Sequence, residues 1–86
     1  MKIQFTTAGF EDLAWWIEND RKTTVKIMKL IKEAARDPLV GQGQPERLVG
    51  RRAAYSRRIS QKDRLVYDVT GDVLSVVSCR FHYDDH

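Results

Sequence analysis

The fold of this chain is decided near its C-terminus by the stretch RLVYDVTGDVLSVVSCRFHY, residues 64–83. Side chains of a β-strand alternate between its two faces, which would put Leu65, Tyr67 and Val69 on one face. Thr70-Gly71-Asp72 has the residue types of a hairpin turn. The stretch therefore predicts two antiparallel strands, over residues 64–69 and 73–83.

The length of that turn determines which side chains share a face. A three-residue loop would pair Val69 with Val73 and place Arg64 on the face of Arg80 and His82, whereas a two-residue turn would move Arg64 to the opposite face. We favour the three-residue loop because it unites an apolar set that would face the rest of the core. That set is Leu65, Tyr67, Val73, Val77 and Phe81.

The preceding segments predict one more strand in this half and one at the N-terminus. Residues 54–59 are typical of a strand, followed by a turn over residues 60–62. Ile3 and Phe5 alternate with polar neighbours and predict a short strand over residues 2–6. Between residues 41 and 45, glycine and proline indicate a loop that leads to Glu46.

Two helices are predicted between the first strand and this loop. We expect Thr7 to cap the first helix, and Asp20 to cap a second that ends at about residue 36, because the residue before Pro38 avoids the helical region. Helical spacing predicts the buried positions of each. They are Phe10, Leu13, Ala14 and Ile17 in the first, and Ile27, Met28, Ile31, Ala34 and Ala35 in the second.

The paired tryptophans of the first helix leave two interpretations open. Trp16 lies on the flank of the predicted stripe and Trp15 lies nearly opposite it. An exposed Trp15 would suggest a contact with another protein, and a Trp15 folded under a loop is the alternative.

The order β-α-α-β-β-β predicts an α+β fold in which two helices pack on one face of an antiparallel sheet. A chain of 86 residues makes one small domain, here residues 1–86. Cys79 is the one cysteine, so no internal disulfide is available, and the sequence lacks a signal peptide and a long apolar run. We therefore expect a cytoplasmic protein. Its histidines and cysteine match no metal-ligand spacing well, which predicts no metal.

Cations gather in two places although the formal net charge is only +3. Spacings of three and four residues bring one set onto a single face of the second helix: Lys22, Lys26, Lys29, Lys32 and Arg36. A second set is opposed only by Asp63: Arg47, Arg51, Arg52, Arg57, Arg58, Lys62 and Arg64. Each set is either an ordinary solvated surface or a surface that binds the phosphates of a nucleic acid.

A small group of residues suits the cleavage of RNA. The 2′-hydroxyl of RNA is an internal nucleophile, so cleavage needs a base, a cation that stabilises the phosphorane, and an acid for the leaving oxygen. Glu46, Arg64 and His82 can fill these roles without a metal. Such residues occur in any small basic domain, so the pattern alone is weak.

Four segments, in this order and spacing, resemble the YoeB (Txe/YoeB) toxins of the RelE superfamily of bacterial toxin–antitoxin systems. The resemblance covers nearly the whole chain. The segments are GQGQPERL (41–48), YSRRI (55–59), RLVY (64–67) and CRFHY (79–83).

This resemblance implies a microbial-ribonuclease-like fold and an mRNA interferase that cleaves mRNA in the ribosomal A site. It implies no cofactor, neutralisation by a cognate antitoxin, a tendency to homodimerise, and binding to operator DNA only as the toxin–antitoxin complex. By position, Glu46 would be the general base, Arg64 the group that stabilises the transition state and His82 the general acid, with Tyr83 placing the scissile phosphate or stacking on a base. We also expect a set of cations to bind mRNA and ribosomal RNA: the helical set with Arg47, Arg51, Arg52, Arg57, Arg58 and Arg80.

Two departures from the family pattern bear on the candidate site. Val49 stands where members often have a lysine, so Arg47, Arg51 or Arg52 would supply that charge, or one phosphate contact is lost. The tail Asp84-Asp85-His86 follows the His-Tyr pair. Its carboxylates would either raise the pKa of His82, by favouring its charged form, or have no role.

Overall fold

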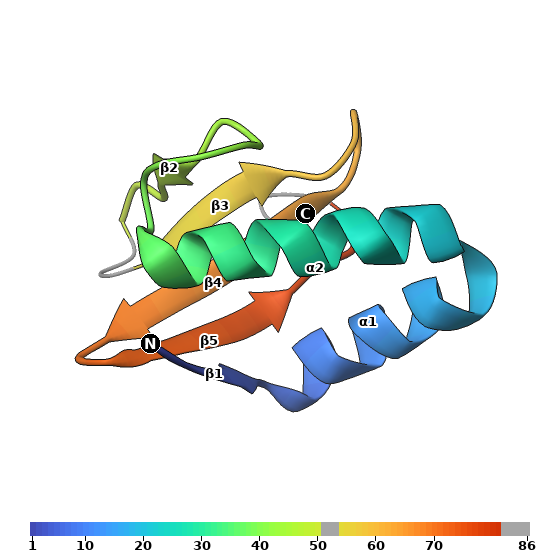
Figure 1. The fold of residues 1–86 in the computed structure, drawn as a ribbon, viewed down its shortest axis with the longest axis horizontal. Coiled ribbons are helices and arrows are strands. Elements are labelled where there is room, and N and C mark those ends of the chain that lie inside the picture. The colour runs from blue at the N-terminus through green and yellow to red at the C-terminus, as the bar shows by residue number, and fades with distance from the viewer. Residues whose placement is uncertain (51–53, 82–86) are drawn as a thin grey trace.

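The computed structural model describes residues 1–50 and 54–81, which form two helices and five strands (Figure 1). In chain order they are β1 (Lys2–Phe5), α1 (Thr7–Asn19), α2 (Arg21–Arg36), β2 (Glu46–Arg47), β3 (Ala54–Arg58), β4 (Arg64–Thr70) and β5 (Val73–Ser78). In the part of the chain so described, no helix is long and apolar enough to cross a membrane.

The strands form one sheet in the order β1-β5-β4-β3-β2; in Figure 1 α2 crosses in front of it, and α1 lies below α2 at the right and contacts β5. The predicted α+β fold with two helices on one face is thus confirmed. The sheet is mixed rather than wholly antiparallel, because β1 pairs with β5 in parallel while the other pairs are antiparallel. The short strand β2, expected as part of a loop, extends the sheet beyond β3.

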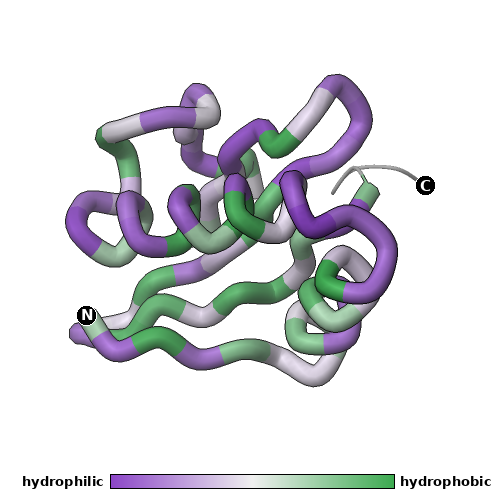
Figure 2. Tube along the Cα trace, turned by 45° about the vertical axis from the view of Figure 1, so that its right-hand side comes forward, coloured by the Kyte–Doolittle hydropathy of each residue, from purple (hydrophilic) through white to green (hydrophobic). Residues whose placement is uncertain are grey.

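Alternation along the central strands separates the core from the free face of the sheet. Leu65 and Tyr67 of β4 and Leu74 and Val76 of β5 are fully buried in one cluster with apolar residues of α1 and α2. Figure 2 shows hydrophobic residues along these strands, whereas the loops are largely hydrophilic. The predicted core positions Val73 and Val77 are only half-buried. The helices therefore contact Leu74 and Val76 instead.

The buried face of α1 differs from the predicted stripe. Phe10 and Ile17 are 61% and 47% exposed, and the buried residues are Gly9, Leu13 and Trp16. Trp16 Nε1 donates to the backbone oxygen of Cys79 at 2.8 Å. Because β5 ends just before Cys79, that buried oxygen needs a donor from outside the sheet, and α1 is rotated to supply one.

The N-termini of the helices are capped by side chains, as the sequence suggests. Thr6, rather than the predicted Thr7, accepts a hydrogen bond from Gly9 N at 3.0 Å and begins α1. Gly9 also lies against the backbone of Val76, where a Cβ atom would clash with the carbonyl oxygen. Asp20 caps α2 through Thr23 N at 3.0 Å, as predicted.

Helix α2 ends at Arg36, as predicted. Its buried face consists of Ile27, Leu30, Ile31 and Ala34. The predicted core residue Met28 is 42% exposed, and Leu30, which the prediction omitted, takes its place.

The β4–β5 hairpin corrects the predicted register. Thr70 pairs with Val73 across a two-residue turn, so the predicted three-residue loop is wrong. An irregularity between Val66 and Tyr67 then shifts the pairing by one residue, so that Val66 pairs with Ser78. A β-bulge of this kind inserts one extra residue into one strand of the pair. It brings Arg64 opposite the residues that follow β5. A two-residue turn without the bulge would have placed Arg64 on the other face.

Strand β5 ends at Ser78, before the predicted end at residue 83. Cys79 donates its backbone N–H to Asp12 Oδ2 at 3.0 Å instead of to the sheet. Phe81 has a φ of 68°, in the left-handed region that aromatic residues seldom adopt. These contacts and this turn stop the ladder, since none of them fits a continuous strand.

Candidate active site

Glu46 and Arg64, the predicted base and cation, lie together on the sheet. Arg64 Nη1 is 3.4 Å from Glu46 Oε1, and the two side chains are 21% and 58% exposed. The same nitrogen is 3.4 Å from Ser56 Oγ. Both contacts are long for hydrogen bonds. Among the described residues the guanidinium, which has five N–H donors, is therefore loosely held by these two contacts.

Strand register explains why residues 18 positions apart meet. Glu46 pairs with Ser56 across β2 and β3, and Arg58 pairs with Arg64 across β3 and β4. Residues directly opposite one another point to the same face of a sheet. Glu46, Ser56, Arg58 and Arg64 therefore share the face away from the buried cluster.

Ser56 is a site residue that the sequence did not indicate. It is fully buried, beneath Arg64, and its hydroxyl faces the guanidinium. The sequence shows that Ser56 and Arg58 lie on the same face of their strand, because they are two positions apart. It does not show the pairing of β3 with β4 that brings Ser56 next to Arg64.

The predicted acid His82 and its neighbour Tyr83 lie outside the described residues, as do Arg51, Arg52 and the tail. The chain before them is firmly attached beside Arg64. Phe81 N donates to Asp63 Oδ1 at 2.7 Å, and Arg64 N donates to Phe81 O at 3.2 Å. The residue that precedes His82 is thus bonded to Arg64 itself.

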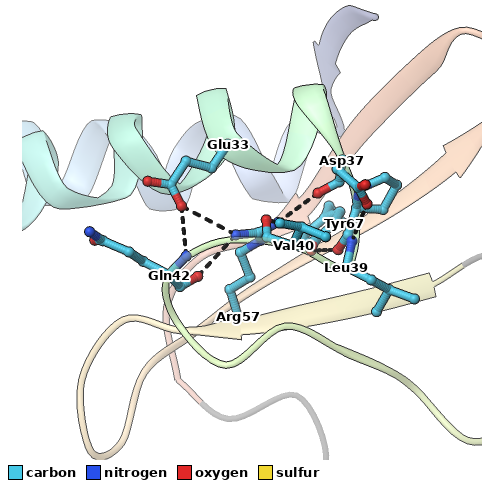
Figure 3. Close-up of polar contacts among 8 residues, drawn as sticks. Glu33, Asp37, Leu39, Val40, Gln42, Arg57 and Tyr67 are labelled. Carbon is cyan, nitrogen blue, oxygen red and sulfur yellow. Dashed lines mark hydrogen bonds and ion pairs between the residues drawn. The ribbon is translucent and has the colours of Figure 1, made fainter.

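Arg57, predicted to bind RNA, is instead a core residue. Its side chain is fully buried, and it donates to Tyr67 Oη and to the backbone oxygens of Asp37, Val40 and Gln42 at 2.7–3.0 Å (Figure 3). Glu33 lies 3.6 Å from it. The prediction for Arg57 is wrong because alternation along β3 turns it inward, where it holds the loop that leads to Glu46.

The other described cations lie at the surface. The helical set is exposed as expected and consists of Lys22, Lys26, Lys29, Lys32 and Arg36. Arg47 and Arg58 are exposed, the former 5.6 Å over the ring of Tyr55. Arg80 lies 3.6 Å over the ring of Trp15, which is 37% exposed. Trp15 is thus covered on one side by an arginine rather than by a loop.

Two further observations limit the chemistry of the described residues. Among them, no group of three or more His, Cys, Asp or Glu side chains could hold a metal ion. Burial raises the pKa of the Cys79 thiol to about 12, with smaller contributions from Asp12 and Asp63. Since the thiolate is the reactive form, Cys79 is not suited to be a nucleophile.

Comparison with known proteins identifies the family. Residues 5–83 match the model of the YoeB-like toxin of bacterial type II toxin–antitoxin systems. A toxin YoeB of Streptomyces coelicolor is 50% identical, over 96% of this chain and 100% of that protein. A YoeB/ParE toxin from Agrobacterium tumefaciens superposes with a TM-score of 0.91 at 41% identity, over 96% and 100% of the two chains.

A YoeB–YefM toxin–antitoxin complex from Staphylococcus aureus, described as heterotetrameric, contains a chain that is 39% identical. It superposes with a TM-score of 0.86, over 96% of this chain and 98% of that one. The chain belongs to the YoeB-like toxins of bacterial type II toxin–antitoxin systems.

Proposed function

We propose that this toxin is a ribosome-dependent endoribonuclease that cleaves mRNA in the ribosomal A site. The observation that carries the proposal is the Glu46–Arg64 pair on the free face of the sheet, where a carboxylate and a loosely held guanidinium lie 3.4 Å apart. A base and a cation at that distance can both contact one phosphodiester and its 2′-hydroxyl.

In this mechanism Glu46 removes the proton of the 2′-hydroxyl. Its carboxylate is 58% exposed, so a substrate can reach it without rearrangement of the sheet. The 2′-oxygen then attacks the adjacent phosphorus, the bond to the 5′-oxygen of the next nucleotide breaks, and a 2′,3′-cyclic phosphate remains. No cofactor takes part in these steps.

Arg64 stabilises the negative charge that develops on the phosphorane. Its planar donors suit two phosphate oxygens at once. Ser56 beneath it and Glu46 beside it contact the guanidinium only at 3.4 Å, and contacts this long leave its donors available to a phosphate.

His82 donates a proton to the leaving 5′-oxygen, and Tyr83 positions the phosphate or stacks on a base. The backbone bond between Arg64 N and Phe81 O supports this assignment, because the residue after Phe81 then starts within reach of the β4 end that carries Arg64. Basic residues of α2, with Arg47, Arg58 and Arg80, contribute contacts to mRNA and ribosomal RNA phosphates.

The partner that neutralises this toxin is a cognate antitoxin. The relative from S. aureus in complex with YefM supports this assignment. Exposed apolar side chains on α1, Phe10 and Ile17, offer such a partner a contact surface that the sheet does not use.

Mapping of mRNA cuts by primer extension on translating ribosomes tests the proposal. We expect wild-type protein to give cuts within A-site codons, and Glu46→Gln to reduce the cleavage rate by about 10²–10⁴-fold. Glu18→Gln on exposed α1 is the matched control and should cut like wild type. Equal cleavage by the Glu46→Gln and wild-type proteins would exclude Glu46 as the base.

A further inference from the structure

A cavity outside the Glu46–Arg64 pair lies at the end of β3, where the strand leads into the β3–β4 turn. It is open to solvent and has a volume of about 410 Å³ between α2, the loop before β2 and the β3–β4 turn. Small-molecule sites are usually about 300–1,000 Å³, so one nucleotide is of suitable size. The side chains that matter for its chemistry are Lys26, Gln42, Gln44, Arg58 and Gln61.

The lining combines two kinds of polar group. Lys26 and Arg58 supply positive charge, and none of the described residues that line the cavity is acidic. Three exposed glutamines add carboxamides, each with a donor and an acceptor edge. A bare anion needs only the cations, whereas a nucleobase presents adjacent donors and acceptors that carboxamides can match.

The cavity walls are held by hydrogen bonds that do not depend on a ligand. Arg58 N donates to Gly43 O at 2.6 Å, and Arg57 Nη1 donates to Gln42 O at 3.0 Å. Lys26 Nζ reaches Ile59 O at 2.5 Å, which fixes the ammonium at one wall. The loop is therefore fastened to β3 before binding, which lowers the entropic cost of ordering the site.

The cavity adjoins the candidate active site through two residues. Arg58 lies directly opposite Arg64 in the β3–β4 register, and Gln44 precedes Glu46 by two positions. A nucleotide held here would neighbour one whose phosphate lies at Arg64.

We propose that this cavity is a nucleotide-binding subsite, in which Lys26 and Arg58 hold a phosphate and the glutamine carboxamides contact the base. It rests on the proposed function, since it assigns a place to the RNA nucleotide beside the cleaved bond. The subsite selects among bases next to the cut, and the Glu46–Arg64 pair performs the chemistry.

Titration of the ¹⁵N-labelled full chain with AMP, GMP, CMP and UMP, observed by NMR, tests the subsite without any cleavage. We expect the side-chain amide signals of Gln42, Gln44 and Gln61 to shift with at least one nucleotide and not with inorganic phosphate. The amide of Gln4, which lies on β1 at the other edge of the sheet, is the internal control. Identical shifts with phosphate alone would show that the cavity binds only anions. No shifts at millimolar nucleotide would overturn the proposed subsite.

Two variants make the assignment specific to the carboxamides. Gln44→Leu and Gln61→Leu should each weaken binding of the preferred nucleotide by about three- to tenfold, the loss expected for one hydrogen bond. Gln4→Leu should leave the affinity unchanged. Unaltered affinity in both cavity variants would overturn the proposal.

The two proposals fail in different experiments. Glu46→Gln protein that no longer cuts mRNA should still bind the nucleotide, because Glu46 does not line the cavity. Loss of nucleotide binding in that variant would show that the cavity is not a separate subsite. Absence of nucleotide binding in a wild-type protein that cleaves mRNA would refute the subsite alone.

Discussion

Two arginines on neighbouring strands of this toxin have opposite environments. The side chain of Arg57 on β3 is fully buried, and its donors are bonded to three backbone oxygens and a tyrosine hydroxyl. Arg64 on β4 is 21% exposed and makes two contacts of 3.4 Å from a single nitrogen. The protein itself uses the donors of Arg57, whereas among the described residues only one nitrogen of the Arg64 side chain has partners.

Each arginine also has an acidic neighbour, and these neighbours differ in the same way. Glu33 accepts a hydrogen bond from Gln42 N at 2.6 Å and lies beside Arg57, so it belongs to the same network. The one described contact of the Glu46 carboxylate is with Arg64. The comparison teaches that residue type does not separate the structural arginine from the candidate catalytic one, whereas the number of donors bonded within the described residues does.

The largest effect should follow removal of the buried guanidinium. Arg57→Ala would remove the ion pair with Glu33 and leave Tyr67 Oη and three part-buried carbonyl groups without their donor, and losing such a network around a buried charge should cost about 3–5 kcal/mol. Urea denaturation measures the free energy of unfolding. Arg58→Ala, one position along the strand and exposed, is the control and should change it by less than about 0.5 kcal/mol. Equal stability of the two variants would show that the network around Arg57 is not structural.

For Arg64 we expect a large loss of activity and a small loss of stability. Arg64→Ala should lower kcat for mRNA cleavage by about 10²–10³-fold, the usual loss for one group that stabilises transition-state charge. Its free energy of unfolding should change by less than about 1 kcal/mol, as for other partly exposed ion pairs. Arg64→Lys keeps the charge but not the planar donors, so it should recover only part of the activity. A large loss of stability in Arg64→Ala would remove the distinction between the two arginines.

The sequence predicted the features of the fold that have local causes. Asp20 caps α2, and Pro38 ends it after Arg36, because both signals act within a few residues. The alternation of Leu65, Tyr67 and Val69 indicated the helix side of β4 for the same reason. The pairing of Glu46 with Arg64 came from the family resemblance, since no local pattern joins positions 18 apart.

What the sequence could not supply depends on contacts between distant segments. The bulge that brings Arg64 opposite the end of β5 arises in strand pairing. The rotation of α1 follows from the need of Cys79 O for the Trp16 donor. Arg57 and Arg58 are adjacent and chemically identical, so only the position of β3 between the core and the free face tells them apart.

Glu33 beside Arg57 and Glu46 beside Arg64 should also differ in their contribution to stability, by a smaller amount. Glu33→Ala removes a hydrogen bond to Gln42 N and an ion pair, and bonds to charged groups contribute about 1.5–3 kcal/mol. Glu46→Ala removes one long, exposed contact and should cost less than about 1 kcal/mol. Thermal and urea unfolding of both variants would measure this difference. Glu46→Ala as the less stable variant would contradict it.

The smallest expected effect is a pH dependence of the free energy of unfolding, which arises from Tyr67 in the network around Arg57. Burial raises the pKa of Tyr67 above its ordinary value of 10.0, although the Arg57 hydrogen bond opposes this. The unfolded chain therefore loses this proton at a lower pH than the folded chain. Its contribution to stability is fully present below pH 10 and is lost as the pH rises through the folded pKa.

The free energy of unfolding of wild type should consequently decrease above pH 10 more steeply than that of Tyr67→Phe, which has no proton to lose there. At neutral pH wild type should be more stable than Tyr67→Phe by about 1–3 kcal/mol. The reason is that the Tyr67 hydroxyl accepts a hydrogen bond from Arg57 Nε at 2.9 Å and donates one to Pro38 O at 2.6 Å. Equal slopes for wild type and Tyr67→Phe would show that the alkaline loss of stability originates outside the Arg57 network, and the two arginines would then not differ in their response to pH.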